Sequence, residues 1–203
     1  MIRVQRYGEQ AALVDVDRAE QVLGLQAALD DEPPPGTVEV VPAAKTLLIR
    51  FDPGLTSFER LSAEITRHSV ADGLRGRGRQ VTIPVRYDGD DVTEVARESE
   101  LTEAEVIERH AAAEYTVAFC GFAPGFGYLT GLDPALRLPR RSVPRTRVPA
   151  GSVAIAGEYT AVYPRESPGG WRLLGRTDLP VWDVDRHPPN LLTPGTRIRF
   201  APR

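Results

Sequence analysis

The chain has 203 residues, of which 41% are apolar and 26% are charged, and both fractions are ordinary for a globular protein. This composition excludes a disordered, collagen-like or coiled-coil chain. The basic residues number 25 and the acidic residues 28, so the net charge of −3 gives no basic field that would attract nucleic acid or an anionic membrane. Glycine and proline, at 18 each, favour many turns and short strands.

The single cysteine, Cys120, allows no disulfide within the chain. The first ten residues carry charges and no apolar core, so they do not resemble a signal peptide. No apolar run approaches the roughly 18 residues of a transmembrane helix. We therefore expect a soluble protein of a reducing cytoplasm.

Residues 1–75 are predicted to form a small α/β domain, in which two helices cover one face of a single sheet. The strands are predicted at residues 2–7, 11–16, 37–41 and 46–51. Asp17 is a candidate cap for the first helix. Thr56 and Glu59 have the spacing of a capping box that would open the second helix.

Residues 72–80 have the composition of a linker, although a long loop inside one domain is the alternative. Residues 81–203 are then predicted to form a second domain. Its first strand, 81–87, contains Pro84 and is expected at an edge or bulge. Helices are predicted over 92–98 and, after a capping box of Thr102 and Glu105, up to Ala113. The short apolar runs that follow suggest a barrel or sandwich; they are residues 117–120, 153–156, 161–163, 171–174 and 197–200.

Several common chemistries are excluded by missing motifs. The chain has no Gly-Lys pair for a Walker A loop and no Gly-x-Ser-x-Gly elbow. Gly125, Gly127 and Gly131 do not have the spacing of a dinucleotide-binding fingerprint. Three scattered histidines and one cysteine give no metal-ligand pattern.

A glycine-rich aromatic motif spans residues 121–129, and its glycines let the backbone approach a ligand. Phe122, Phe126 and Tyr128 would give that ligand a rigid apolar wall. A tight loop packed under the barrel is the alternative interpretation.

Five arginines and no acidic residue occur between Arg137 and Arg147. Guanidinium groups bind carboxylates or phosphates through two parallel hydrogen bonds. The alternative is a solvated charged surface, and nucleic acid is a weaker option because no basic surface extends elsewhere.

Two further motifs combine glycine with polar or aromatic residues. Gly151 and Ser152 could offer an amide and a hydroxyl together, or form a turn into a buried strand. The Pro-Gly-Gly-Trp sequence ending at Trp171 could place an indole at a rim, or form a hairpin turn with a core tryptophan. His110 is a candidate general acid or base, although a histidine on the apolar side of a helix is more often a core residue.

These motifs resemble, in type and order, those of the family of 5-oxoprolinase B subunits, also called the kinase inhibitor KipI or allophanate hydrolase subunit 1 family. The motifs that carry the resemblance are GFAPGFGYL, PRRSVPRTRVPAGSVAIAG, VYPRESPGGWRLLGRT and PNLLTPGTRIRF. They cover residues 81–203 densely and residues 1–80 loosely, and residues 43–45 depart from the family pattern.

The resemblance implies an α+β fold in which residues 1–75 form the small α/β domain and residues 81–203 a cyclophilin-like β-barrel. It implies a protein that acts with the A and C subunits of the same enzyme to cleave the lactam of 5-oxoproline to L-glutamate while ATP is hydrolysed. ATP would be a co-substrate, bound here or on a partner, and no metal or prosthetic group is predicted. A urea- or allophanate-directed amide carboxylase system and a histidine-kinase inhibitor are the alternatives.

The resemblance also selects candidate site residues. His110 and Arg145 are the candidate catalytic residues. The candidate substrate-binding residues are Phe122, Pro124, Gly125, Phe126, Tyr128, Arg140, Gly151, Ser152, Tyr163, Gly169, Gly170 and Trp171.

Overall fold

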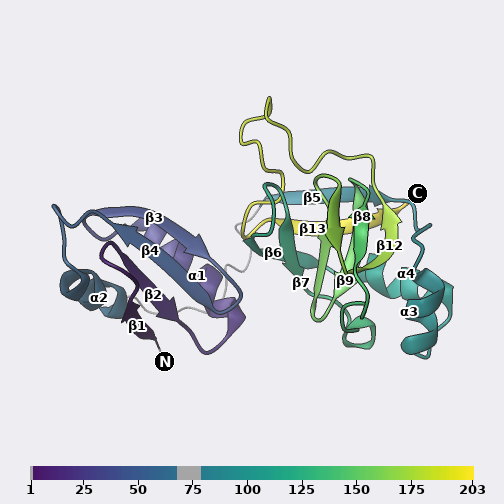
Figure 1. Ribbon diagram of the computed structural model, residues 1–203, viewed down its shortest axis with the longest axis horizontal. Helices are drawn as coiled ribbons and strands as arrows, with labels where there is room; N and C mark the ends of the chain where they lie inside the picture. The colour runs from purple at the N-terminus through teal and green to yellow at the C-terminus, as the bar shows by residue number, and fades with distance from the viewer. Residues whose placement is uncertain (1, 68–78) are drawn as a thin grey trace. The chain divides into compact units, whose positions relative to one another are not determined.

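The computed structural model describes residues 2–67 and 79–203. Contacts divide the chain into two compact units, Met1–Arg77 and Gly78–Arg203 (Figure 1). Most of the linker predicted at 72–80 lies outside the described residues.

The first unit contains an antiparallel sheet with the strand order β1-β2-β4-β3. Its elements are β1 (Arg3–Arg6), β2 (Ala11–Asp15), α1 (Ala19–Asp31), β3 (Thr37–Pro42), β4 (Thr46–Phe51) and α2 (Phe58–Arg67). Alternation along β2 and β4 turns Val14 and Ile49 to the same face, where they share a core with Leu25 of α1 and Leu61 of α2. Both helices therefore cover one face of the sheet, as predicted.

Both helix starts in this unit differ from the predicted caps. The N-cap of α1 is Arg18 rather than Asp17. Helix α2 begins after Ser57, whose hydroxyl accepts a hydrogen bond from the Arg60 amide at 3.4 Å. Thr56 cannot cap this helix because its side chain is buried against Gly36.

The second unit is built around a seven-stranded sheet with the order β12-β9-β10-β7-β6-β13-β5. Its elements are β5 (Gln80–Val85), α3 (Val92–Glu98), α4 (Glu103–Ala112), β6 (Tyr115–Cys120), β7 (Gly127–Thr130), the 3-10 turn η1 (Pro134–Leu136), β8 (Arg145–Val148), β9 (Ser152–Ala156), β10 (Tyr159–Val162), β11 (Ser167–Gly169), β12 (Arg172–Arg176) and β13 (Arg197–Pro202). The predicted capping box of α4 is confirmed, because the Thr102 hydroxyl accepts from the Glu105 amide and the Glu105 carboxylate accepts from the Thr102 amide.

The two edges of this sheet meet, which makes it a nearly closed barrel. Arg86 follows β5, and its backbone exchanges two hydrogen bonds of 2.9 and 2.8 Å with that of Arg176 at the end of β12. Strand β5, which contains Pro84, is the last strand in the order, as expected for a strand that contains proline. The mixed α/β fold with a C-terminal β-barrel is therefore confirmed.

The barrel strands bury side chains on both faces. Val153 and Ile155 of β9 point into the barrel interior, where they share a core with Val95 of α3 and Val106 of α4. The alternate residues of β9, Ala154 and Ala156, belong to a second apolar cluster. Val148 of the β8–β11 ladder lies in that second cluster, so the ladder packs on the outer face of the barrel (Figure 1).

Candidate functional site

An aromatic cluster lies on this outer face. It consists of Phe119, Phe122, Phe126, Tyr128, Tyr159, Tyr163 and Trp171. Phe126 is at its centre, with its ring centroid 5.1 Å from that of Tyr128, 5.3 Å from Tyr163 and 5.5 Å from Trp171. The contacts are edge-to-face, the geometry that aromatic quadrupoles prefer. All five aromatic residues that the sequence selected thus lie together, although they come from motifs up to 49 residues apart.

The loop between β6 and β7 presents the most exposed ring of the cluster. Phe122 is 59% exposed and has φ = 65°, a conformation that residues other than glycine seldom adopt. Gly125 has φ = 83°, and a Cβ there would lie 2.6 Å from the Cβ of Trp182, so glycine is required. Strained conformations of this kind concentrate at ligand-binding loops.

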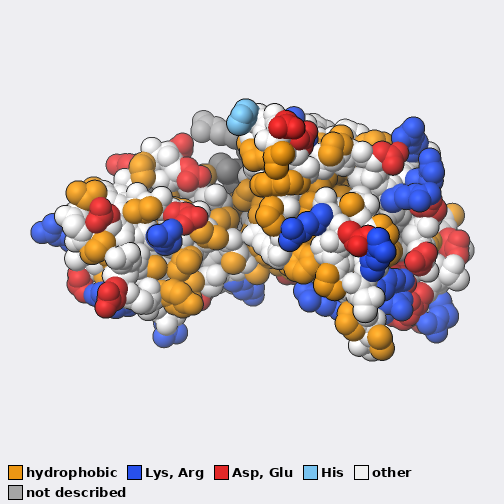
Figure 2. Space-filling model, turned by 45° about the horizontal axis from the view of Figure 1, so that its top comes forward, with side chains coloured by type: hydrophobic (Ala, Val, Ile, Leu, Met, Phe, Trp, Pro, Cys, Tyr) orange, Lys and Arg blue, Asp and Glu red, His pale blue; other side chains and the backbone are white. Residues whose placement is uncertain are grey.

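Tyr163 links the aromatic cluster to the glycine pair Gly169 and Gly170, which precedes Trp171. A Cβ on Gly169 would lie 2.2 Å from the Tyr163 hydroxyl, so only glycine allows this approach. Burial raises the pKa of Tyr163, while the nearby Arg140 charge and the Trp171 amide oppose the shift. Arg140 is therefore close enough to the cluster to act on its tyrosine electrostatically. On the face of the barrel unit seen in Figure 2, apolar side chains gather with arginines beside them.

The structure divides the arginine run into bound and unbound side chains. Arg145 forms two hydrogen bonds to Asp91, of 2.9 and 2.8 Å, and Arg141 forms a third of 2.6 Å. Arg147 pairs with Glu166 at 2.5 Å, and the Arg137 Nε donates to a backbone carbonyl. Within the described parts of the chain, Arg140 has no hydrogen bond or ion pair. It is the arginine of the run that is available to a ligand.

Asp91, the partner of Arg141 and Arg145, was not among the candidate site residues. Its side chain is 2% exposed. Burial disfavours its ionisation, but hydrogen bonds from Arg145 and the Leu173 amide, with the charges of Arg145 and Arg141, hold its pKa below the usual value. The only sequence signal was an aspartate before a predicted helix.

Gly151 and Ser152 are joined through their backbones to Tyr163 of the aromatic cluster, because the Gly151 amide donates to the Tyr163 carbonyl at 2.8 Å and the Tyr163 amide donates to the Ser152 carbonyl at 2.9 Å. The Ser152 hydroxyl is buried and donates to the Pro149 carbonyl at 2.8 Å. Gly151 has φ = 79°, and a Cβ there would lie 2.3 Å from the Thr177 carbonyl oxygen. Ser152 lines a hollow of about 370 Å³ together with Asp88 and other residues of the β5–α3 and β12 ends.

His110 lies inside the barrel and has no exposed surface. Its Nε2 lies 2.9 Å from the Thr160 hydroxyl, which itself donates to the Ala154 carbonyl, so Nε2 carries the proton. Its Nδ1 then accepts from the Tyr87 hydroxyl at 2.8 Å. Burial lowers the pKa of His110 to about 3, which keeps the ring neutral. The candidate catalytic role of His110 stays a prediction, and in this geometry the ring is separated from solvent.

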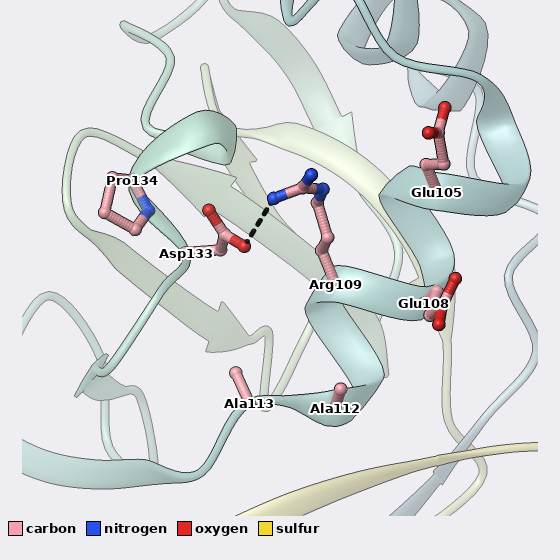
Figure 3. Close-up of a pocket in the computed structure, with 7 residues that line it drawn as sticks. All are labelled: Glu105, Glu108, Arg109, Ala112, Ala113, Asp133 and Pro134. Atoms are coloured by element: carbon pink, nitrogen blue, oxygen red, sulfur yellow. Dashed lines mark hydrogen bonds and ion pairs between the residues drawn. The ribbon is translucent and has the colours of Figure 1, made fainter.

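A second hollow, of about 510 Å³, lies between α4 and η1, and it contains none of the predicted site residues (Figure 3). Arg109 and Asp133 face each other across it at 3.1 Å. Both side chains already have a partner, and no sequence motif pointed to this place.

Residues 2–67 and 79–203 hold no group of three or more His, Cys, Asp or Glu side chains arranged for a metal ion. No helix in the same residues has the length and apolar character needed to cross a membrane.

The sequence and fold both match known proteins. Residues 2–192 match the family described as carboxyltransferase domain, subdomain C and D. The chain is 36% identical to the B subunit of 5-oxoprolinase from Bacillus subtilis, over 98% of this chain and 92% of that protein. The crystal structure of TTHA0988 superposes with a TM-score of 0.83 at 40% identity, covering 96% of this chain but 40% of that one. The Kluyveromyces lactis urea amidolyase shares the fold at 22% identity, with a TM-score of 0.78 over all of this chain and 15% of that one.

The first match places the protein in the class of carboxyltransferase-type domains. Within this class, the chain belongs to the family of 5-oxoprolinase B subunits. Its relatives are components of an enzyme complex.

Proposed function

We propose that this chain is the B subunit of an ATP-dependent 5-oxoprolinase, which opens the lactam of 5-oxoproline to give L-glutamate. The name and extent of its relatives support this proposal. The chain spans 92% of the Bacillus subtilis protein but 40% of the TTHA0988 chain, so a homologue exists in which this region is part of a longer polypeptide.

The observation that carries the proposal is that Arg140 is exposed and unpaired within the described residues, next to Arg141, whose amide donates to the carbonyl of Gly170, the residue before Trp171 of the aromatic cluster. 5-Oxoproline has a small five-membered ring and one carboxylate. Arg140 would bind the carboxylate through charge-assisted hydrogen bonds. The ring would pack against exposed aromatic surface, of which Phe122 offers the largest share. One unpaired cation beside an apolar wall fits a small anionic ring better than a polyanion.

ATP would be bound mainly by a partner protein. The glycine-rich loop at 121–126 leads into β7 rather than a helix, so it lacks the helix N-terminus that binds phosphate in common nucleotide sites. Phosphoryl transfer to the lactam oxygen would make the carbonyl carbon more reactive toward water, and that step needs positive charge at the phosphate. We therefore propose that the A and C subunits complete the active site and that this chain alone is inactive.

The sequence likeness to the Lachancea kluyveri urea amidolyase covers 35% of this chain and 4% of that protein, and the structural likeness at 22% identity supports the fold alone, so a urea- or allophanate-directed reaction is the less supported alternative. Inhibition of a histidine kinase stays a prediction that no finding tests.

The test is to co-express the chain with A and C subunits of a 5-oxoprolinase and to measure glutamate release from 5-oxoproline with and without ATP. Reactions that lack one of the three proteins, and a complex containing Arg140→Gln, are the controls. ATP-dependent glutamate release by the full complex, weakened in the variant, supports the proposal. ATP hydrolysis that responds to urea and not to 5-oxoproline contradicts it.

A further inference from the structure

Asp91 binds four hydrogen-bond donors from two separate parts of the chain. Its Oδ1 accepts from Arg141 at 2.6 Å and from Arg145 at 2.8 Å. Its Oδ2 accepts from Arg145 at 2.9 Å and from the Leu173 amide at 2.7 Å. The Asp91 amide donates back to the Leu173 carbonyl at 3.1 Å, so the start of α3 is joined to β12.

A carboxylate with 2% exposure is stable only when it is paired, because its desolvation is unfavourable. Asp91 meets this requirement with Arg141 and Arg145, and Arg141 also contacts Glu94 at 3.0 Å. These two arginines are therefore part of the internal structure of the unit.

The backbone of Arg140 is held on both sides. Before it, the Pro139 carbonyl accepts from Arg172, whose side chain is 6% exposed and also pairs with Glu98 at 2.8 Å. After it, Arg141 is fixed by Asp91, and its amide donates to the Gly170 carbonyl at 2.8 Å. The chain is thus fastened at residues 139 and 141, the latter to Gly170, the residue before Trp171 of the aromatic cluster, while the side chain of Arg140 between them is exposed.

We propose that Asp91 is a positioning residue for substrate binding. By holding Arg141 and Arg145 it directs Arg140 toward the aromatic cluster and leaves that guanidinium as the cation available to the substrate carboxylate. This inference rests on the proposed function and names the residue that prepares its anion site.

The kinetic test is Asp91→Asn in the reconstituted complex. Asparagine keeps an oxygen acceptor for the Leu173 amide but loses the charge that holds both arginines. We expect KM for 5-oxoproline to rise about tenfold while kcat changes less than about twofold, because only the binding geometry is disturbed. Because Asp91 acts on the substrate only through Arg140, the Asp91→Asn/Arg140→Gln double variant should have a KM no higher than that of Arg140→Gln alone.

Asp133→Asn is the matched control. Asp133 also accepts from an arginine and a backbone amide, at 3.1 and 2.9 Å, but lies outside the arginine run. It should leave KM unchanged. Arg141→Gln removes one of the donors to Asp91 if Asp91→Asn fails to fold, and it should raise KM without lowering kcat. A folded Asp91→Asn complex with unchanged KM would overturn the proposal. A double variant whose KM rises by the product of the two single-variant increases would overturn it as well.

A chemical test separates this inference from the proposed function, because it needs no activity. Phenylglyoxal modifies accessible arginines, and mass spectrometry of peptides locates the label. In the wild-type chain, Arg140 should react several-fold faster than Arg141 and Arg145, and Asp91→Asn should expose these two. Equal labelling of all three in the wild type would overturn the positioning role. If the three arginines label as expected but the wild-type complex does not turn over 5-oxoproline, the positioning role stands and the proposed function is contradicted.

Discussion

Gly169 lies directly against the hydroxyl of Tyr163, where an added Cβ would be 2.2 Å from the oxygen. Gly169→Ala should therefore lower the free energy of unfolding by about 1–3 kcal/mol, because the buried ring has no room to move. Gly170→Ala is the control, since its Cβ would meet neighbours at 3.5 Å, an ordinary contact distance. Urea denaturation measures both. Adding Tyr163→Phe should restore part of the loss; a Gly169→Ala protein as stable as wild type would show that the approach is not close.

His110 should make stability depend on pH. Its pKa is about 3 in the folded protein and near its ordinary 6.5 when unfolded, so the unfolded chain binds the additional proton between these values. Stability from the neutral ring is complete above pH 6.5 and decreases as the pH falls toward 3. The slope should approach about 1.4 kcal/mol per pH unit in that interval.

The measurement is the free energy of unfolding of wild type and His110→Asn at several pH values. The difference between the two should shrink as the pH decreases, because asparagine does not titrate. His187→Asn, at an exposed histidine, should follow the wild type. A pH-independent difference for His110→Asn would mean that folding does not change the pKa of the ring.

Arg145 and Arg147 should differ in their effect on stability, although they lie only two positions apart. Arg145→Gln leaves the buried Asp91 carboxylate with fewer partners and should cost about 1–3 kcal/mol. Arg147→Gln breaks a pair in which the two side chains are 74% and 49% exposed, and it should cost less than about 0.5 kcal/mol. Equal melting behaviour of the two variants would show that the Asp91 network does not stabilise the fold.

We expect the chain to form a stable complex with a partner protein. Co-expressed with a homologue of the C subunit, the chain should elute from size-exclusion chromatography as one complex, with an interface of at least about 1,200 Å². Phe122→Asp, at the most exposed ring of the aromatic cluster, tests whether that face takes part. Separate elution of the two wild-type chains would contradict the proposed assembly. Glutamate formation by this chain alone would contradict its predicted inactivity.

Local sequence determined most of the secondary structure. The Thr102–Glu105 box marked the start of α4, and Pro84 indicated an edge strand. These signals depend on neighbouring residues or on backbone chemistry, so they can be recognised without the fold. The predicted capping box failed where tertiary packing took the side chain, at Thr56, which is buried against Gly36.

The motifs also identified residues that meet in space, since the aromatic residues from two stretches form one cluster. Composition could not decide what each arginine of the run does. Arg140, Arg141 and Arg145 look alike in sequence, and their environments differ because Asp91, about 50 residues earlier, binds two of them and not the third. Likewise, His110 is kept neutral by burial among Tyr87 and Thr160, which come from distant segments. Desolvation and long-range pairing arise only when the chain folds, so these properties were decided by tertiary structure.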